Sequence, residues 1–108
     1  MSFELVIRPE AEADAREAFH WYEEQLRGLG ESFLSELDRE LTAISVEPAL
    51  HARVHREIRR ALLHRFPYGV YYLVESRRVA VLAILHTSRH PRHWARRQGA
   101  SPEDAKDL

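Results

Sequence analysis

The chain has 108 residues, of which 44% are hydrophobic and 31% charged, so it is long enough for one globular domain and too short for two. It contains no cysteine, which excludes a disulfide framework, thiolate chemistry and any cysteine-based zinc site. The longest apolar run, residues 79–85, is far shorter than a membrane span, and residues 1–4 do not begin a signal peptide. We therefore expect a soluble cytoplasmic protein without a membrane partner.

The formal net charge of −1 conceals opposite charges in the two halves of the chain. Residues 1–50 carry 12 acidic and 4 basic side chains, whereas residues 51–98 carry 11 arginines against Glu57 and Glu75. Six of the seven histidines also lie in the basic half. This asymmetry favours an anionic partner, because a nearly neutral protein can still present one positive face. The alternative is that the two halves neutralise each other across the fold.

The first half of the chain predicts a short strand followed by two helices. Alternating apolar residues over 3–8 indicate the strand, and Pro9 suits the first helical turn, where its missing N–H costs nothing. Gly28 and Gly30 interrupt the helical pattern, and Glu47-Pro48 ends the second helix. Because the link is short, the helices should form an antiparallel hairpin. Their apolar stripes contain Ala11, Ala15, Ala18, Phe19, Tyr22, Leu26 and Leu29, and then Phe33, Leu34, Leu37, Leu41 and Ile44.

The second half predicts three strands, from about His55 to Arg65, over 69–74 and over 79–85. The last run is apolar on both faces, so it should be the central or most covered strand, with helices on one side and a tail or partner on the other. The order predicts an α+β fold: an N-terminal strand and an antiparallel helical hairpin packed on an antiparallel sheet completed by a three-strand meander. Residues 1–98 should form this single domain, and residues 99–108 a flexible acidic tail.

Several segments resemble the ParE/RelE superfamily of bacterial toxins. Residues 59–74 (RRALLHRFPYGVYYLV) resemble the middle hairpin of the family, and residues 79–86 (VAVLAILH), followed by Arg89-His90-Pro91 and Trp94, resemble its last strand and the segment after it. Pro9-Glu10-Ala11 and the Trp21-Tyr22 pair also match the first helix of the family. The resemblance covers roughly residues 3–97, and its order of elements agrees with the order expected from the residues alone.

The resemblance implies a RelE/ParE-like fold and a growth-inhibiting toxin of a type II toxin–antitoxin system. The cognate antitoxin would wrap its C-terminal segment across the helices and the sheet. Members of the RelE-like branch cleave mRNA on the ribosome without metal, whereas members of the ParE-like branch poison DNA gyrase. We expect no cofactor, and a homodimer or a hetero-oligomer with the antitoxin in solution.

The basic half supplies candidate residues for either branch. Metal-free RNA cleavage needs a base, an acid and cations on the phosphate. Candidates for proton transfer or base stacking are Tyr68, His86, Arg89 and His90, with Tyr71 as an alternative stacking residue. Candidates for phosphate or target binding are Arg59, Arg60, Arg65, Arg92, Trp94, Arg96 and Arg97.

Two features favour the ParE-like branch. The RelE-like branch uses lysines in its basic site, but the only lysine here is Lys106, and arginine is a poor acid or base. The chain also continues well past His86, whereas the catalytic histidine or tyrosine of that branch lies near the chain end. The C-terminal arginines would then form a binding surface. A ribosome-dependent mRNA endoribonuclease and a nontoxic binding module remain alternatives.

A zinc site is the least favoured reading of the histidines. The spacing of His86, His90 and His93 could suit zinc on a helix, but Pro91 interrupts that helix and no nearby acid completes the set. No metal is therefore expected.

Overall fold

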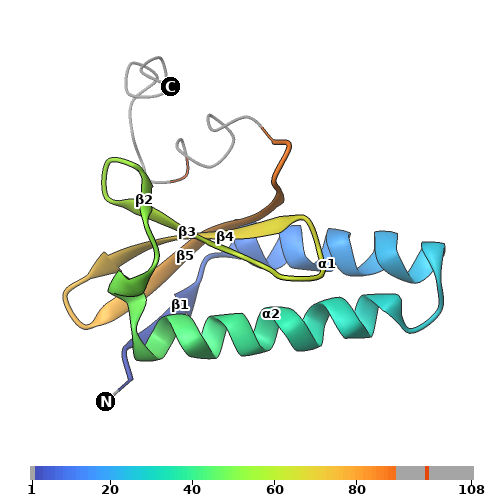
Figure 1. The fold of residues 1–108 in the computed structure, drawn as a ribbon, viewed down its shortest axis with the longest axis horizontal. Helices are drawn as coiled ribbons and strands as arrows, with labels where there is room; N and C mark the ends of the chain where they lie inside the picture. The colour runs from blue at the N-terminus through green and yellow to red at the C-terminus, as the bar shows by residue number, and fades with distance from the viewer. Residues whose placement is uncertain (1, 90–96, 98–108) are drawn as a thin grey trace.

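The computed structural model describes residues 2–89 and 97 of the chain. Figure 1 shows two helices packed beside a five-stranded sheet, which confirms the predicted α+β fold class. In chain order the elements are β1 (Glu4–Ile7), α1 (Pro9–Gln25), α2 (Leu29–Val46), the 3-10 helix η1 (Pro48–Leu50), β2 (Arg53–His55), β3 (Ile58–Leu62), β4 (Tyr68–Glu75) and β5 (Arg78–His86).

The sheet has the strand order β1-β5-β4-β3-β2 and is mixed, not wholly antiparallel as predicted. Strands β2 to β5 pair antiparallel, but β1 pairs parallel with β5, with Leu5 opposite Val79. The helical hairpin returns the chain to the start of β1, where the N–H of Phe3 donates to the carbonyl of Ser45 at 2.8 Å. Strand β3 runs in the same direction as β1, and the chain reverses twice between β3 and β5. Strand β5 therefore runs parallel to β1.

The strand expected from about His55 is two strands in the structure. Arg56 has a φ of 50°, a left-handed conformation that turns the chain between β2 and β3. The sequence pattern did not separate them, because arginines continue through both strands and through the turn.

Helix α1 is shorter than its predicted apolar stripe. The helix ends at Gln25, Leu26 is extended and 63% exposed, and Leu29 already belongs to α2. Gly28 adopts a φ of 89°, which favours glycine and reverses the chain between the helices.

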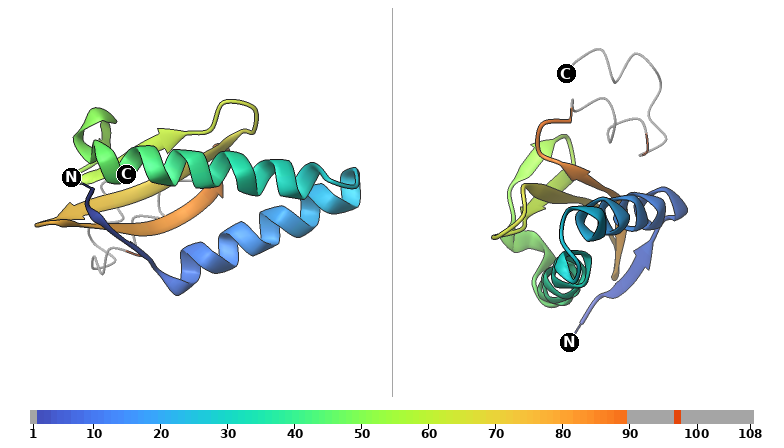
Figure 2. Two further views of the ribbon diagram at one scale, coloured as in Figure 1. Left: turned by 90° about the horizontal axis from the view of Figure 1, so that it is seen from below. Right: turned by 90° about the vertical axis from the view of Figure 1, so that its right-hand side faces the viewer.

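The hairpin turn is held by a carboxylate from α1. Glu23 accepts hydrogen bonds from the N–H groups of Gly28 (3.2 Å) and Gly30 (2.8 Å), two donors that would lack a partner within α2. These bonds, led by the one from Gly28, lower the pKa of the Glu23 carboxyl. The helices touch here, because a Cβ on Gly30 would lie 2.6 Å from the carbonyl oxygen of Phe19. From this contact α1 and α2 diverge toward their other ends (Figure 2).

The main core lies between the helical hairpin and one face of the sheet. Its helix residues include Ala11, Ala18, Phe33 and Leu37, all at most 5% exposed. Its strand residues are Ala61, Val70, Tyr72, Val79, Val81 and Ile84. The core therefore consists of the apolar stripes that the sequence predicted, packed on one face of the meander.

A second apolar cluster occupies the other face of the sheet, formed by Ile58, Tyr71, Leu73, Leu82, Ala83 and Leu85. Strand β5 contributes to both clusters and is buried from Val79 to Leu85, as expected for the most covered strand. It lies between β1 and β4. A β-bulge interrupts it, because Tyr71 pairs with Ala83 while Tyr72 pairs with Val81, which leaves Leu82 as an extra residue.

Neither α1 nor α2 has both the length and the apolar character that a bilayer-spanning helix needs.

Candidate functional site

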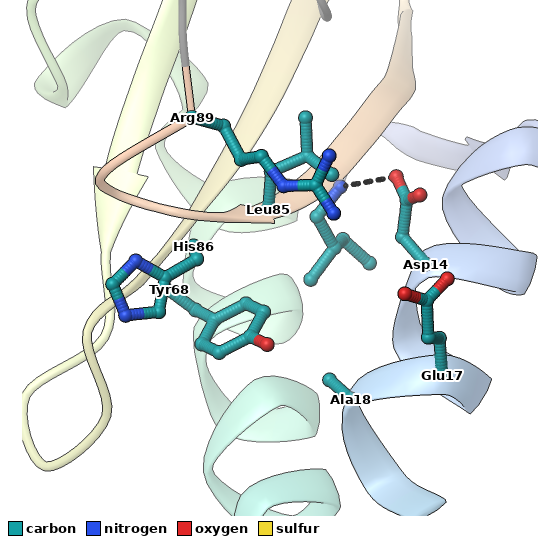
Figure 3. A pocket seen from close by; sticks show the side chains of 8 residues that line it. Asp14, Glu17, Ala18, Tyr68, Leu85, His86 and Arg89 are labelled. Carbon is teal, nitrogen blue, oxygen red and sulfur yellow. Dashed lines mark hydrogen bonds between the residues drawn. The ribbon is translucent and has the colours of Figure 1, made fainter. Parts of the chain in front are cut away.

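A pocket lies at the end of the β4–β5 hairpin, beside the middle of α1 (Figure 3). Tyr68 begins β4 and pairs directly with His86, which ends β5, and their ring centroids are 5.5 Å apart. Arg89 follows in the next turn, where its backbone N–H donates to the carbonyl of His86 at 3.0 Å. The structure thus brings together three of the four residues predicted for proton transfer or stacking. The fourth, His90, lies outside the described residues.

Tyr68 is held in place by aromatic neighbours. Its ring centroid lies 5.1 Å from that of Phe33 and 6.0 Å from that of Tyr22, both in the main core. Burial, and then the negative charge of Glu17, raise the pKa of the Tyr68 hydroxyl, although Arg89 acts in the opposite direction. Tyr68 therefore keeps its proton at neutral pH and can donate a hydrogen bond.

His86 is oriented by its own turn. The N–H of Ser88 donates to Nδ1 of His86 at 3.1 Å, so in the neutral ring the proton must lie on Nε2. A neutral His86 therefore carries a hydrogen-bond donor at Nε2. It could accept a substrate proton at Nδ1 only after the bond from Ser88 had broken.

The opposite wall of the pocket is acidic and comes from α1. Asp14 and Glu17 are one helical turn apart, and the Asp14 side chain is only 10% exposed. The Asp14 carboxylate accepts the backbone N–H of Ile84 at 3.0 Å and forms an ion pair with Arg97 (Figure 3 shows the first contact). Neither Asp14 nor Glu17 is among the site residues predicted from the sequence. The sequence does contain a sign that Asp14 is buried. At helical spacing it lies beside Ala11, Ala15 and Ala18, at the edge of the apolar stripe that faces the core.

A wider groove of about 510 Å³ adjoins this pocket and shares Glu17, Tyr68, His86 and Arg89 with it. Its other lining residues are Trp21, Tyr22, Pro67 and Ser88. The Trp21 side chain is 54% exposed, which is high for so large an apolar residue. Trp21 and Tyr22 carry part of the family resemblance but are not among the site residues predicted from the sequence.

The predicted binding arginines of β3 and the β3–β4 loop do not gather on one wall. The guanidinium of Arg59 donates to the carbonyls of Ala49 (3.2 Å) and His51, near η1. Arg60 lies on the opposite face of the sheet, where its side chain passes over Gly69. The Nε of Arg65 donates to the carboxylate of Glu36 at 2.9 Å, although its side chain is 61% exposed.

Arg97, at the C-terminal end of the described chain, makes internal contacts. Its guanidinium binds Asp14 and donates to the carbonyl of Leu82 at 3.3 Å, while its own carbonyl accepts a hydrogen bond from Arg8 at 2.6 Å. Arg92, Trp94 and Arg96, the other predicted binding residues of this region, lie outside the described residues. Beyond the end of β1, Arg97 therefore binds the exposed edge of β5 through the carbonyl of Leu82.

Among residues 2–89 and 97, no group of three or more histidine or carboxylate side chains could hold a metal ion. The chemistry of the pocket is that of hydrogen-bond donors, namely Tyr68, His86 and Arg89, facing the carboxylates of Asp14 and Glu17.

Three solved structures share this fold. The chromosomal ParDE toxin–antitoxin system of P. aeruginosa aligns with a TM-score of 0.71 at 15% identity, over 79% of this chain and 96% of that one. An E. coli RelE toxin variant in the free state aligns with a TM-score of 0.62 at 18% identity, over 82% and 86%. The RelBE2 toxin–antitoxin complex of Mycobacterium tuberculosis aligns with a TM-score of 0.57 at 16% identity, over 80% and 99%. At such identities these similarities establish the fold alone.

The sequence itself gives the family. No protein of curated function matches the chain. The model of the ParE toxin of the parDE type II toxin–antitoxin system matches residues 5–91, which include both helices, all five strands and the pocket described above. The chain therefore belongs to the ParE toxin family of type II toxin–antitoxin systems.

Proposed function

We propose that this toxin inhibits growth by binding DNA gyrase and that it does not cleave RNA. The observation that carries the proposal is the match of residues 5–91 to the ParE toxin family, because gyrase poisoning is the activity that the resemblance to the ParE-like branch implies. The chemistry of the pocket and the placement of the arginines support it.

The pocket is poorly suited to metal-free RNA cleavage, because its donors are not ready to accept a proton. Tyr68 stays protonated, Arg89 does not lose its proton, and the Nδ1 of His86 is engaged by Ser88. Glu17 could accept a proton, but its charge offsets that of Arg89, and Asp14 is paired with Arg97, so the pocket offers no excess positive charge to a substrate phosphate.

The placement of the arginines also argues against a phosphate-binding wall. Arg59, Arg65 and Arg97 each bind an acceptor of the protein itself, and Arg60 lies on the other face of the sheet. A continuous RNA backbone needs several cations that are free to contact phosphates along one surface. A protein target needs only a few well-placed contacts.

Induction of the chain alone in bacteria tests the proposal. Gyrase poisoning predicts filamentous cells with an induced DNA-damage response, and the purified toxin should inhibit supercoiling by gyrase. Rapid arrest of translation with cleaved messages would instead establish the RelE-like alternative, which the convergence of Tyr68, His86 and Arg89 favours. In that case His86→Ala should abolish cleavage of the messages. A well-expressed chain without any growth defect would support a nontoxic binding module.

The partner proposed for the helical hairpin is the antitoxin. Where α1 and α2 diverge, they leave an apolar groove of about 380 Å³ whose lining includes Ala15, Phe19, Leu34, Leu37 and Leu41. Leu34 is 39% exposed in this groove. An amphipathic helix of a partner could cover these residues, as in other helix-in-groove complexes.

A matched pair of leucine variants tests this partner surface. Leu34→Asp should abolish neutralisation by the antitoxin encoded beside the toxin, because it places a charge in the groove. Leu26→Asp should retain neutralisation, because Leu26 is exposed outside the groove. Equal neutralisation of both variants would place the antitoxin elsewhere.

A further inference from the structure

The groove beside the candidate site has the composition of a protein-binding surface. Trp21 projects from α1 with 54% of its surface exposed, and Tyr22, Pro67 and Tyr68 line the same groove. Tryptophan, tyrosine and arginine are the residues that contribute most often to the energy of protein interfaces. Arg89 supplies the arginine of this set.

The aromatic base of the groove is rigid. Tyr22 packs edge-on against Phe66 with ring centroids 4.9 Å apart, and Phe33 packs against Phe66 at 5.4 Å and against Tyr68 at 5.1 Å. Trp21 in turn packs edge-on against Tyr22 at 5.1 Å. The β3–β4 loop that carries Phe66 is fixed by Glu36, which accepts the N–H groups of His64 (2.6 Å) and Arg65 (3.0 Å). A ligand would therefore meet aromatic surfaces that are already in place.

The polar groups along these aromatics are mainly hydrogen-bond donors. The indole of Trp21 and the guanidinium of Arg89 can only donate. His86 presents Nε2–H because its Nδ1 accepts the N–H of Ser88. The hydroxyl of Tyr68 keeps its proton. A fitting ligand must therefore offer acceptors at several points.

The charge of the site selects among acceptor-rich ligands. Glu17 lines the groove directly, and Asp14 lies in the adjoining pocket one helical turn away. Arg89 offsets the charge of Glu17 in the groove, and Arg97 offsets that of Asp14, so the site carries no excess positive charge that would attract a phosphate or a run of acidic side chains, and an uncharged carbonyl is the acceptor that fits. A proline-rich segment offers such carbonyls on a solvated backbone, lacks N–H donors at its prolines, and presents flat apolar rings to aromatic side chains.

We propose that the groove formed by Trp21, Pro67, Tyr68, His86 and Arg89 binds an extended, proline-containing segment of the toxin's protein target. The prolines pack against Trp21 and Tyr68, and the backbone carbonyls accept hydrogen bonds from the donors of the groove. The inference rests on the proposed function in that the segment belongs to the target protein and not to the antitoxin.

A synthetic decaproline peptide tests the groove without knowledge of the target. The chain has two tryptophans, so Trp94→Phe leaves Trp21 as the sole source of an indole N–H signal in an NMR spectrum. Titration with decaproline should shift the signals of Trp21, Tyr68 and His86 in a saturable way. In the same background, Trp21→Ala should weaken binding about 30-fold, the usual loss at an interface hot spot. Leu26→Ala, which removes an exposed side chain near the end of the same helix, should have no effect.

A single-stranded RNA hexamer is the competing probe. Shifts of Trp21 and Tyr68 by the RNA but not by decaproline would overturn the proposal in favour of a nucleotide site. Unchanged signals with both probes would also overturn it.

The cellular test separates this inference from the proposed function. Trp21→Ala should lose growth inhibition and inhibition of gyrase supercoiling, while its melting temperature and its neutralising complex with the antitoxin remain. If Trp21→Ala inhibits gyrase as well as the parent does, the groove is not the target site, although the proposed function stands. If the parent inhibits growth without acting on gyrase, the proposed function fails, and the decaproline titration still decides the chemistry of the groove.

Discussion

The carboxylate of Asp14 in α1 accepts the backbone N–H of Ile84 in β5 at 3.0 Å, across 70 positions of the sequence. The contact lies just beyond the end of β1, where Arg8 makes the last backbone bond to β5 through the carbonyl of Val81 (3.1 Å). From that point the edge of β5 has no strand partner on this side among residues 2–89 and 97, and side chains satisfy its polar groups. Asp14 takes the N–H of Ile84, and Arg97 takes the carbonyl of Leu82.

Replacement of Asp14 tests how much this edge depends on one carboxylate. Asp14→Ala leaves the N–H of Ile84 without its acceptor and Arg97 without its counter-ion, so we expect a loss of about 2–4 kcal/mol in the free energy of unfolding. Asp14→Asn keeps an acceptor and should cost less. Urea denaturation measures both variants, with Glu10→Ala on the exposed side of α1 as the control. Equal stability of Asp14→Ala and the control would contradict this role.

Glu36 should make the stability of the protein fall in acid. Burial raises the pKa of its carboxyl, but the hydrogen bonds from the Arg65 side chain and from the N–H groups of Arg65 and His64 outweigh burial and lower the pKa overall. Because the folded state then binds fewer protons than the unfolded chain, the contribution of Glu36 is present at neutral pH and is lost as the pH falls below about 4.5.

Urea denaturation at pH 7 and at pH 3.5 checks this dependence. Glu36→Gln should be less stable than the parent at pH 7, and the difference should shrink at pH 3.5. Some acid dependence should remain in the variant, because the pKa of Glu23 is lowered as well. A difference that is the same at both pH values would show that the charge of Glu36 is unimportant.

The two glycines of the hairpin turn should respond differently to alanine. In Gly30→Ala the new Cβ would lie 2.6 Å from both the Phe19 carbonyl oxygen and the Glu23 Cγ, so the helices must separate, at a cost of about 1–3 kcal/mol. At Gly28 nothing lies within 4 Å, and only the φ of 89° opposes a side chain. Gly28→Asn should therefore be tolerated better than Gly28→Ala. Thermal unfolding followed by circular dichroism ranks the three variants, and a stable Gly30→Ala would contradict the close contact.

Tyr72 should ionise late in the folded protein. Its hydroxyl donates to the carbonyl of Pro48 at 2.6 Å, and burial raises its pKa to about 12, with Arg59 acting in the opposite direction. The raised pKa means that the folded state holds this proton longer than the unfolded chain, so stability should decline as the pH rises from about 10. Absorbance titration at 295 nm should show a late transition that disappears in Tyr72→Phe. Ionisation of Tyr72 near pH 10 before unfolding would contradict the prediction.

Much of the fold could be predicted from local patterns, and the departures have physical causes. The apolar stripes of α1 and α2 predict the hairpin, and Gly28 marks the turn, but a stripe cannot show that Leu26 and Leu29 lie on opposite sides of that turn. The parallel pairing of β1 with β5 is a long-range contact that no short pattern encodes. In the run from Val79 to Leu85, apolar residues occupy both faces, so alternation gives no sign that Leu82 is a bulge.

The candidate site was partly predictable. Tyr68, His86 and Arg89 were proposed from their residue types, and the β4–β5 pairing brings them together. The roles of Arg59, Arg65 and Arg97 depend on carbonyls and carboxylates from distant segments, which charge counting cannot locate. The place of Trp21 in the groove could not be predicted either, because Pro67 and Arg89, which line the same groove, are close to it only in the fold.

The extra residue in β5 decides on which side of the sheet the strand ends. Before the bulge, Val79 and Val81 point toward the helices, and after it Ile84 does so, which is a change from odd to even positions. His86 continues the even series and therefore meets Tyr68 on the helical side. If the nine residues of β5 alternated without a bulge, the His86 imidazole would point to the opposite face of the sheet and would not meet Tyr68. The bulge at Leu82 thus sets the geometry of a pocket that the Leu82 side chain does not line.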